Sequence, residues 1–357
     1  MNVKTVSLTL ASGLAGAALA SAILLQPAVP TVEAANPQTP PLVLKELGTF
    51  FIGGETIFSE FNDTTAGVLD PGILTVNNSY VKFAIPAGQR SDFPIILHTG
   101  GGHTGKVYET TPDGREGWAT YFPRTGIPVY NMDGVNRGGS LWDLTEIAMV
   151  GQGVLPPHDM PRINRRHHEQ AWVGFRIGPE LGVPFADTQF PIDAFDEYTN
   201  QLVPAFRDPI EDDKNVAALV ALLDEIGPAI VLTWSQSGRF GVRATVQRPD
   251  LVKALILLEP AAVSPDGMIS GVSQAELDSI SHIPILLQAG DFDEPRLERQ
   301  QNLCDNIGEN CTQLNLTELG IFGNGHTVMV ERNNIEVADL IIAWLRGVLD
   351  RREFRAK

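Results

Sequence analysis

A serine at the end of an apolar stretch has the surroundings of a nucleophile. Residues 231–238 read Val-Leu-Thr-Trp-Ser-Gln-Ser-Gly, which is typical of a strand that passes directly into a helix. Such a sharp turn needs small residues two positions before and after the nucleophile, and Thr233 and Ser237 are small. With Ser237 at the centre, Arg239 would occupy one of these positions. The sequence therefore predicts Ser235 as the nucleophile, with a serine-rich turn that has no chemistry as the alternative.

A histidine late in the chain is the candidate base. A serine hydroxyl is a poor nucleophile near neutral pH, and it needs a base within hydrogen-bond reach that a carboxylate orients. Gly323-Asn324-Gly325-His326 precedes the last expected helix, and its glycines allow a sharp bend. We therefore expect His326 to take the proton of Ser235, with a histidine on a surface turn as the alternative.

Two places in the chain offer the carboxylate. Glu259 ends the apolar run 254–258, where burial of a lone carboxylate would be costly unless a partner pairs with it. Asp293 follows the next apolar run, and both residues give the chain order Ser, acid, His. We predict Glu259 as the acid, keep Asp293 as the alternative acid and place Asp291 behind both. A solvated turn would also explain the two aspartates.

Backbone amides are expected to stabilise the negative charge that develops on the attacked oxygen. The turn at Ser235 points the amide of Gln236 towards the attacked carbonyl. A second amide should come from the glycine-rich stretch 98–105, since N–H groups converge on an anion only where side chains do not obstruct them. We assign Gly100 first and Gly101 second. A phosphate-binding loop is disfavoured because the Lys-Ser/Thr ending of that motif is missing.

Strands and helices alternate along most of the chain, as the placement of these side chains requires. Strands, the first two as an antiparallel pair, are predicted at residues 48–58, 79–85, 93–98, 127–132, 229–233, 252–258, 283–289 and 313–319. Helical spacing is found at residues 115–124, 193–202, 215–226, 240–247 and 334–349. The alternation predicts an α/β fold with a mostly parallel sheet and helices on both faces.

The regular alternation of strands and helices lapses for about 70 residues after Ser140. A structureless loop of this length inside a domain is suspect, so we predict an inserted cap with short helices of its own. The chain then divides into a leader (1–35), a first core part (36–140), the cap (141–214) and a second core part (215–357).

The cap is expected to lie over the carboxyl edge of the sheet and to select the substrate. Its aromatic residues suit an apolar substrate group or a small cap core: Trp172, Phe175, Phe185, Phe190 and Phe195. The candidate substrate contacts are Gly101, Trp172, Phe190 and Trp234. A basic cluster is suited to a substrate carboxylate or to pairing with surface acids: Arg162, Arg165, Arg166, His167 and His168.

The first 35 residues have the pattern of a signal peptide. Lys4 precedes an apolar run, and the small residues up to Ala34 suit cleavage there, with an alternative site at Ala20. A membrane anchor is the other interpretation, but glycine, serine and alanine make the run weakly lipophilic. We expect export to the periplasm or the extracellular space.

The net charge bears on possible binding partners, and the two cysteines bear on a possible disulfide. The formal net charge of −17 disfavours binding to nucleic acid and to anionic lipid. Cys304 and Cys311 are the two cysteines, and in an oxidising compartment they would close a small loop, with two unpaired thiols as the alternative. We expect no metal and no cofactor.

The chain after the leader resembles the α/β-hydrolase superfamily, and within it a branch of secreted bacterial and fungal esterases. The matching stretches are residues 98–105, 111–118, 133–140, 233–238, 258–260 and 323–326. Similar members use a glutamate after the strand that follows the nucleophile helix, which implies a Ser-Glu-His triad with Glu259. Thr99 departs from the pattern, because the superfamily usually has glycine there.

The resemblance implies an exported serine hydrolase of the carboxylesterase type, which cleaves small esters or lactones through an acyl-enzyme on Ser235. Amide cleavage or acyl transfer by the same triad is the first alternative, and a non-catalytic exported binding module is the last. A dehalogenase is disfavoured because that chemistry needs aspartate in place of Ser235. We expect no membrane contact after the leader is removed, and a homodimer is left open.

Overall fold

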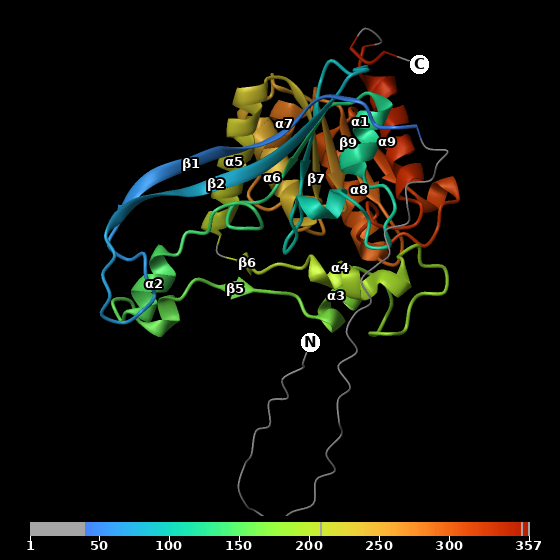
Figure 1. Cartoon of the computed structure of the whole chain (residues 1–357). Helices are drawn as coiled ribbons and strands as arrows, with labels where there is room; N and C mark the ends of the chain where they lie inside the picture. The colour runs from blue at the N-terminus through green and yellow to red at the C-terminus, as the bar shows by residue number, and fades with distance from the viewer. Residues whose placement is uncertain (1–39, 208, 351–352, 356–357) are drawn as a thin grey trace, which may run out of the picture.

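One eight-stranded sheet forms the centre of the computed structural model, which describes residues 40–207, 209–350 and 353–355 (Figure 1). The strands lie in the order β1 (Leu44–Ser59), β2 (Gly72–Pro86), β4 (Val129–Met132), β3 (Ile95–His98), β7 (Ala229–Trp234), β8 (Val252–Leu258), β9 (Ile285–Ala289) and β10 (Cys311–Asn315). The strand β2 pairs antiparallel with β1 and β4, and every other pair in the sheet is parallel. The predicted fold class, with its opening antiparallel pair, is confirmed.

Helices cover both faces of the sheet because successive strand residues point to opposite sides. In β3, Ile95 and Leu97 belong to one buried cluster and Ile96 to the other. The first cluster includes residues of α1 (Trp118–Thr125) and α9 (Asn334–Val348). The second includes residues of α5 (Ile210–Ile226), α6 (Gly238–Gln247), α7 (Gln274–Ile280) and α8 (Glu294–Ile307).

Short elements between β4 and α5 form a separate layer below the sheet in Figure 1. They are α2 (Thr145–Gly151), β5 (Ile163–Asn164), α3 (His168–Gly174), α4 (Phe195–Asn200) and β6 (Ala205–Phe206), and β5 pairs antiparallel with β6. We call residues 141–209 the cap segment. The helix α5 begins at Ile210, so the predicted cap boundary at 214 falls inside a helix. The first turn of α5 is acidic, which complements the helix dipole, and it lacks the apolar spacing by which a sequence marks a helix.

One further expected element was wrong in part, and two helices were not expected. The predicted strand 313–319 is found at Cys311–Asn315, and Thr317–Leu319 instead form a 3₁₀ turn. The helices α7 and α8 were not predicted. The helix α8 buries only four of its side chains against the core, so its sequence carries little apolar periodicity.

The predicted pairing of the two cysteines is confirmed. A disulfide joins Cys304 in α8 to Cys311 at the start of β10, with 5.3 Å between the Cα atoms. The cross-link therefore ties a surface helix to the edge strand of the sheet.

Removal of this disulfide is expected to destabilise the protein. The double substitution Cys304→Ser and Cys311→Ser should lower the free energy of unfolding by about 2 to 3 kcal/mol, because the unfolded chain regains the freedom of a short closed loop. Urea denaturation of the oxidised protein and the double variant measures the difference. An unchanged midpoint in the double variant would show that the cross-link contributes no stability.

The predicted signal peptide, residues 1–35, lies outside the described residues. No helix within the described residues combines the length and the apolar character that a bilayer crossing needs.

Candidate active site

Ser235 lies at the sharp turn between β7 and α6. The strand ends at Trp234, a 3₁₀ turn covers Ser235–Ser237, and α6 begins at Gly238. The φ angle of Ser235 is 56°, in the left-handed region that non-glycine residues rarely adopt. Ser237, the competing candidate, is fully buried, and its hydroxyl accepts a 2.9 Å hydrogen bond from the Trp234 amide. Ser235 is therefore partly exposed and available to react, whereas the hydroxyl of Ser237 stabilises the turn.

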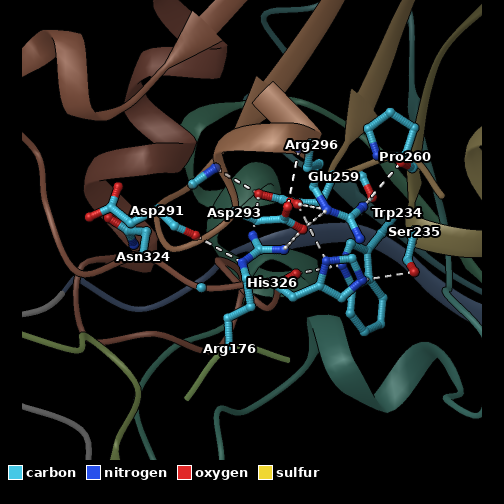
Figure 2. A network of polar contacts seen from close by, with 12 residues as sticks. Arg176, Trp234, Ser235, Glu259, Pro260, Asp291, Asp293, Arg296, Asn324 and His326 are labelled. Carbon is cyan, nitrogen blue, oxygen red and sulfur yellow. Dashed lines mark hydrogen bonds and ion pairs between the residues drawn. The ribbon is translucent and has the colours of Figure 1, made fainter. Parts of the chain in front are cut away.

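His326 is held directly against Ser235. Its Nε2 atom lies 2.8 Å from Ser235 Oγ, and a dashed line marks this contact in Figure 2. The backbone around the ring is fixed from two sides, since the His326 amide donates to the Phe175 carbonyl at 3.0 Å and its carbonyl accepts from the Trp234 indole at 2.7 Å. The Phe175 ring also stacks on the imidazole at an interplanar angle of 5°. The imidazole is therefore oriented before any substrate binds.

The loop that carries His326 requires glycine at a close approach. Gly323 has a φ of 85°, and a Cβ atom at this position would lie 1.8 Å from the Asp187 carbonyl oxygen of the cap segment. The Gly323 carbonyl accepts a hydrogen bond from Gln189, which also belongs to the cap segment. The cap segment and the histidine loop are thus joined through their backbones.

Glu259 lies on the far side of the imidazole from Ser235 (Figure 2). It follows β8, is fully buried and has a φ of 48°. Its Oε2 lies 3.4 Å from His326 Nδ1, and its Oε1 accepts hydrogen bonds of 2.6 Å from Arg176 and from the Gly290 amide. Arg296 approaches Oε2 at 3.4 Å. The partner that a buried carboxylate requires is therefore a pair of arginines.

Asp293 and Asp291 have other contacts. Asp293 is the N-cap of α8, where its side chain accepts a hydrogen bond from the Arg296 amide at 3.1 Å and forms an ion pair with that guanidinium. Asp291 accepts a 2.6 Å hydrogen bond from the Gly323 amide. Within the described part of the chain, Glu259 is the carboxylate that bonds to His326.

Burial and neighbouring charges determine the protonation states of His326 and Glu259. Burial lowers the pKa of His326 to about 4, although the hydrogen bond to Glu259 works against the shift. Burial on its own would raise the pKa of Glu259, but the guanidinium of Arg176 and the contact with His326 hold it well below its ordinary range. Near neutral pH the imidazole is thus uncharged and able to accept a proton, beside an ionised carboxylate.

The pH dependence of the reaction should reflect the low pKa of His326. We expect kcat/KM to stay level from neutral pH down to about pH 5 and to fall by half near pH 4, because only the uncharged imidazole accepts the serine proton. Initial rates across this range give the profile, and circular dichroism at each pH controls for unfolding. A fall by half near 6.5, the ordinary histidine value, would contradict the buried, shifted base.

The predicted oxyanion residues are held by a buried arginine that the sequence did not mark. A Cβ atom on Gly100 would lie 2.7 Å from the Trp234 ring and 3.1 Å from Ser235 Cβ, so only glycine fits this approach. Arg137, from the loop after β4, donates to the Gly100 carbonyl at 3.1 Å and to the Gln236 side-chain oxygen at 2.8 Å. Burial lowers the pKa of Arg137 to about 10, so the guanidinium remains charged near neutral pH. The guanidinium of Arg137 therefore connects the loop after β3, which carries Gly100, to the turn after β7, which carries Gln236.

Thr99 belongs to the loop after β3 that also carries Gly100. Its buried hydroxyl donates to the His103 carbonyl at 3.2 Å, so the departure from glycine adds a hydrogen bond across the loop.

A cavity of about 430 Å³ opens at Ser235. It is lined by Gly101, Arg166, Phe175, Arg207, Pro209, Asp212, Ser235, Gln236, Arg239, Ala261, Ala262 and Ser270. Gly101 is thus at the cavity, as expected of a substrate contact. The other three candidate contacts, Trp172, Phe190 and Trp234, are buried in the first core cluster and do not line it. The two cap aromatics, Trp172 and Phe190, pack on Phe195, and all three belong to the cluster that covers one face of the sheet.

A buried carboxylate that the sequence analysis missed supports the histidine loop. Glu331 accepts hydrogen bonds from the Asn324 side chain at 2.6 Å and from the Gly325 amide at 2.9 Å. Burial raises the pKa of Glu331 to about 7. No motif singles out Glu331 or Arg176 in the sequence, since each gains its partner only when distant loops meet.

The sequence and the fold were also compared with those of known proteins. The chain is 30% identical over 318 residues to the protein named "Probable secreted lipase phiG" of Fungal sp. (strain ATCC 74256), a match that covers 75% of the chain and 85% of the relative. It is 38% identical over 73 residues to Lipase LipV of Mycobacterium tuberculosis, which covers 20% of the chain and 28% of that protein. The solved structure of a novel bacterial esterase superimposes with a TM-score of 0.80 at 33% identity, and the match covers 88% of this chain and 99% of the esterase. No protein-family model matches the chain.

Proposed function

The chain belongs to the α/β-hydrolase family of esterases and lipases, and from this premise we propose that it hydrolyses carboxylic esters or lactones through an acyl-enzyme on Ser235. The observation that carries the proposal is the 2.8 Å contact between Ser235 Oγ and His326 Nε2, at a strained strand-to-helix turn. A buried, ionised Glu259 behind the imidazole supports the assignment of the third residue.

The proposed reaction has two halves. His326 takes the proton of Ser235 as the hydroxyl attacks the ester carbon, and Glu259 stabilises the imidazolium that forms. The amides of Gln236 and of the loop at Gly100 stabilise the oxyanion. His326 then gives its proton to the departing alcohol, which leaves an acyl group on Ser235. A water molecule then gives a proton to His326 as it attacks the acyl carbon, and His326 returns this proton to Ser235 Oγ as the carboxylic acid leaves.

The reaction class can be tested with matched substrates. Purified protein should hydrolyse p-nitrophenyl esters of short acids much faster than the corresponding p-nitroanilides. A preference for the anilides would instead favour an amidase, and transfer of the acyl group to an added alcohol in place of water would favour an acyltransferase.

We also propose that the protein is exported after cleavage of its leader near Ala34. Support comes from the name of the fungal relative, which describes a secreted lipase, and from the disulfide between Cys304 and Cys311. N-terminal sequencing of the mature protein from its native host would test this: a terminus near residue 35 is expected, and an intact Met1 in the cell interior would contradict it.

A further inference from the structure

Two arginines of the cap segment face the cavity at Ser235. Arg166 and Arg207 both line it, and both are partly exposed. The Nη1 atom of Arg207 lies 2.9 Å from the position that a Cβ atom on Gly101 would take. The guanidinium of Arg207 therefore lies close to the backbone of Gly101, in the wall of the cavity.

Neighbouring groups hold both guanidiniums in place. Arg207 follows β6, donates through its backbone amide to the Arg162 carbonyl at 2.8 Å, and donates through Nε to the Asn164 side chain at 2.5 Å. Arg166 lies 5.0 Å above the ring of Phe175, the same ring that stacks on the imidazole of His326. The two charges are thus part of the wall of the cavity.

Among the described residues, no carboxylate lies within ion-pair distance of Arg166 or Arg207. Asp212, a carboxylate that lines the cavity, already accepts hydrogen bonds from Nε and Nη2 of Arg239, at 2.5 and 2.8 Å. Burial and then the neighbouring Arg166 lower the pKa of Arg207.

The chain carries a formal net charge of −17, so carboxylates outnumber cationic side chains. Some arginines elsewhere on the surface, such as Arg243 and Arg248, have acidic partners at 2.5 and 2.6 Å. Two cations placed together cost free energy through mutual repulsion, and an anion between them removes that cost. Arg166 and Arg207 also line a second hollow of about 510 Å³.

We propose that the preferred substrate is an ester that carries a carboxylate close to the bond that is cleaved, and that Arg166 and Arg207 bind this carboxylate. The inference rests on the proposed ester hydrolysis and specifies its substrate class. Planar guanidiniums with several N–H donors match a carboxylate, which accepts two hydrogen bonds side by side. The cavity volume suits a small molecule of this kind.

A matched pair of substrates tests the proposal. The mono-p-nitrophenyl ester of glutaric acid and p-nitrophenyl valerate differ only in a carboxylate that replaces the terminal methyl group. We expect the wild type to favour the anionic ester in kcat/KM by about tenfold or more, and the preference to weaken as NaCl concentration rises.

Variants assign this preference to the two arginines. Arg207→Gln and Arg166→Gln should each lower kcat/KM for the anionic ester by about tenfold to a hundredfold and change the valerate rate by about threefold or less. Arg207→Lys should retain part of the preference, because it keeps the charge. Arg248→Gln, at an exposed ion pair with Asp224, is the control and should leave the ratio unchanged. Free glutarate should inhibit the wild type competitively and inhibit Arg207→Gln much less.

The outcomes separate this inference from the proposed function. Equal rates on the two esters, or an Arg207→Gln variant that loses both activities equally, would overturn the carboxylate site while ester hydrolysis stands. A wild type that cleaves neither ester would overturn the proposed function itself.

Discussion

Replacement of Ser235 by alanine is expected to lower kcat for ester hydrolysis by about 10⁴-fold or more, because it removes the atom that forms the acyl-enzyme. The substitution deletes one oxygen from a partly exposed side chain, so the fold should be unaffected. Steady-state rates on a p-nitrophenyl ester, with the wild type assayed in parallel, provide the measurement.

Two comparisons make the Ser235→Ala result specific. The thermal unfolding midpoint of the variant should match that of the wild type. Ser279→Ala, at an exposed serine that donates to the Glu276 carbonyl, should keep full activity. A Ser235→Ala variant that retains more than about 1% of the wild-type rate would contradict the assignment of the nucleophile.

Substitution of Glu259 by glutamine should have the next largest effect, with a loss in kcat of about 10³-fold or more. The amide carries no charge to stabilise the imidazolium of His326. It would also leave Arg176, which bonds to Glu259 at 2.6 Å, without its buried counter-charge. Loss of one partner from a buried ion pair costs about 3 to 5 kcal/mol of stability, so rates must be measured well below the lowered unfolding midpoint.

Asp293→Asn is the matched comparison for the third residue. Asparagine caps a helix about as well as aspartate, so α8 should keep its N-terminus. We expect kcat to change by about threefold or less, because Asp293 contacts the arginines and not His326. If Asp293→Asn loses far more activity than Glu259→Gln, the acid has been assigned to the wrong residue.

The parts of the fold that could be predicted are those with strong local patterns. The run 229–233 has the continuous apolar character of a strand covered on both faces, and the observed strand β7 is fully buried. The register around Ser235 could be predicted because a tight turn restricts side-chain size over a few residues. The chain order Ser, acid, His follows from the order of the strands, so the three candidates were expected at one edge of the sheet.

Contacts between distant loops could not be predicted. Arg176 lies 83 positions before Glu259 in the chain and reaches it only because the cap segment folds over the end of β8. The cap segment has little periodicity, and its aromatic residues look the same in a sequence whether they pack together or line a cavity. The sequence therefore suggests Trp172 and Phe190 as substrate contacts, although both are core residues, and it does not mark Arg207, whose guanidinium lies next to Gly101.

Labelling with a fluorophosphonate probe tests the central claim most directly, because the probe bonds only to a serine activated by a neighbouring base. Intact mass spectrometry of the purified protein should show one probe per chain, and peptide mapping should locate it on Ser235. A wild-type protein that takes up no probe, or that carries it on Ser237, would contradict the account.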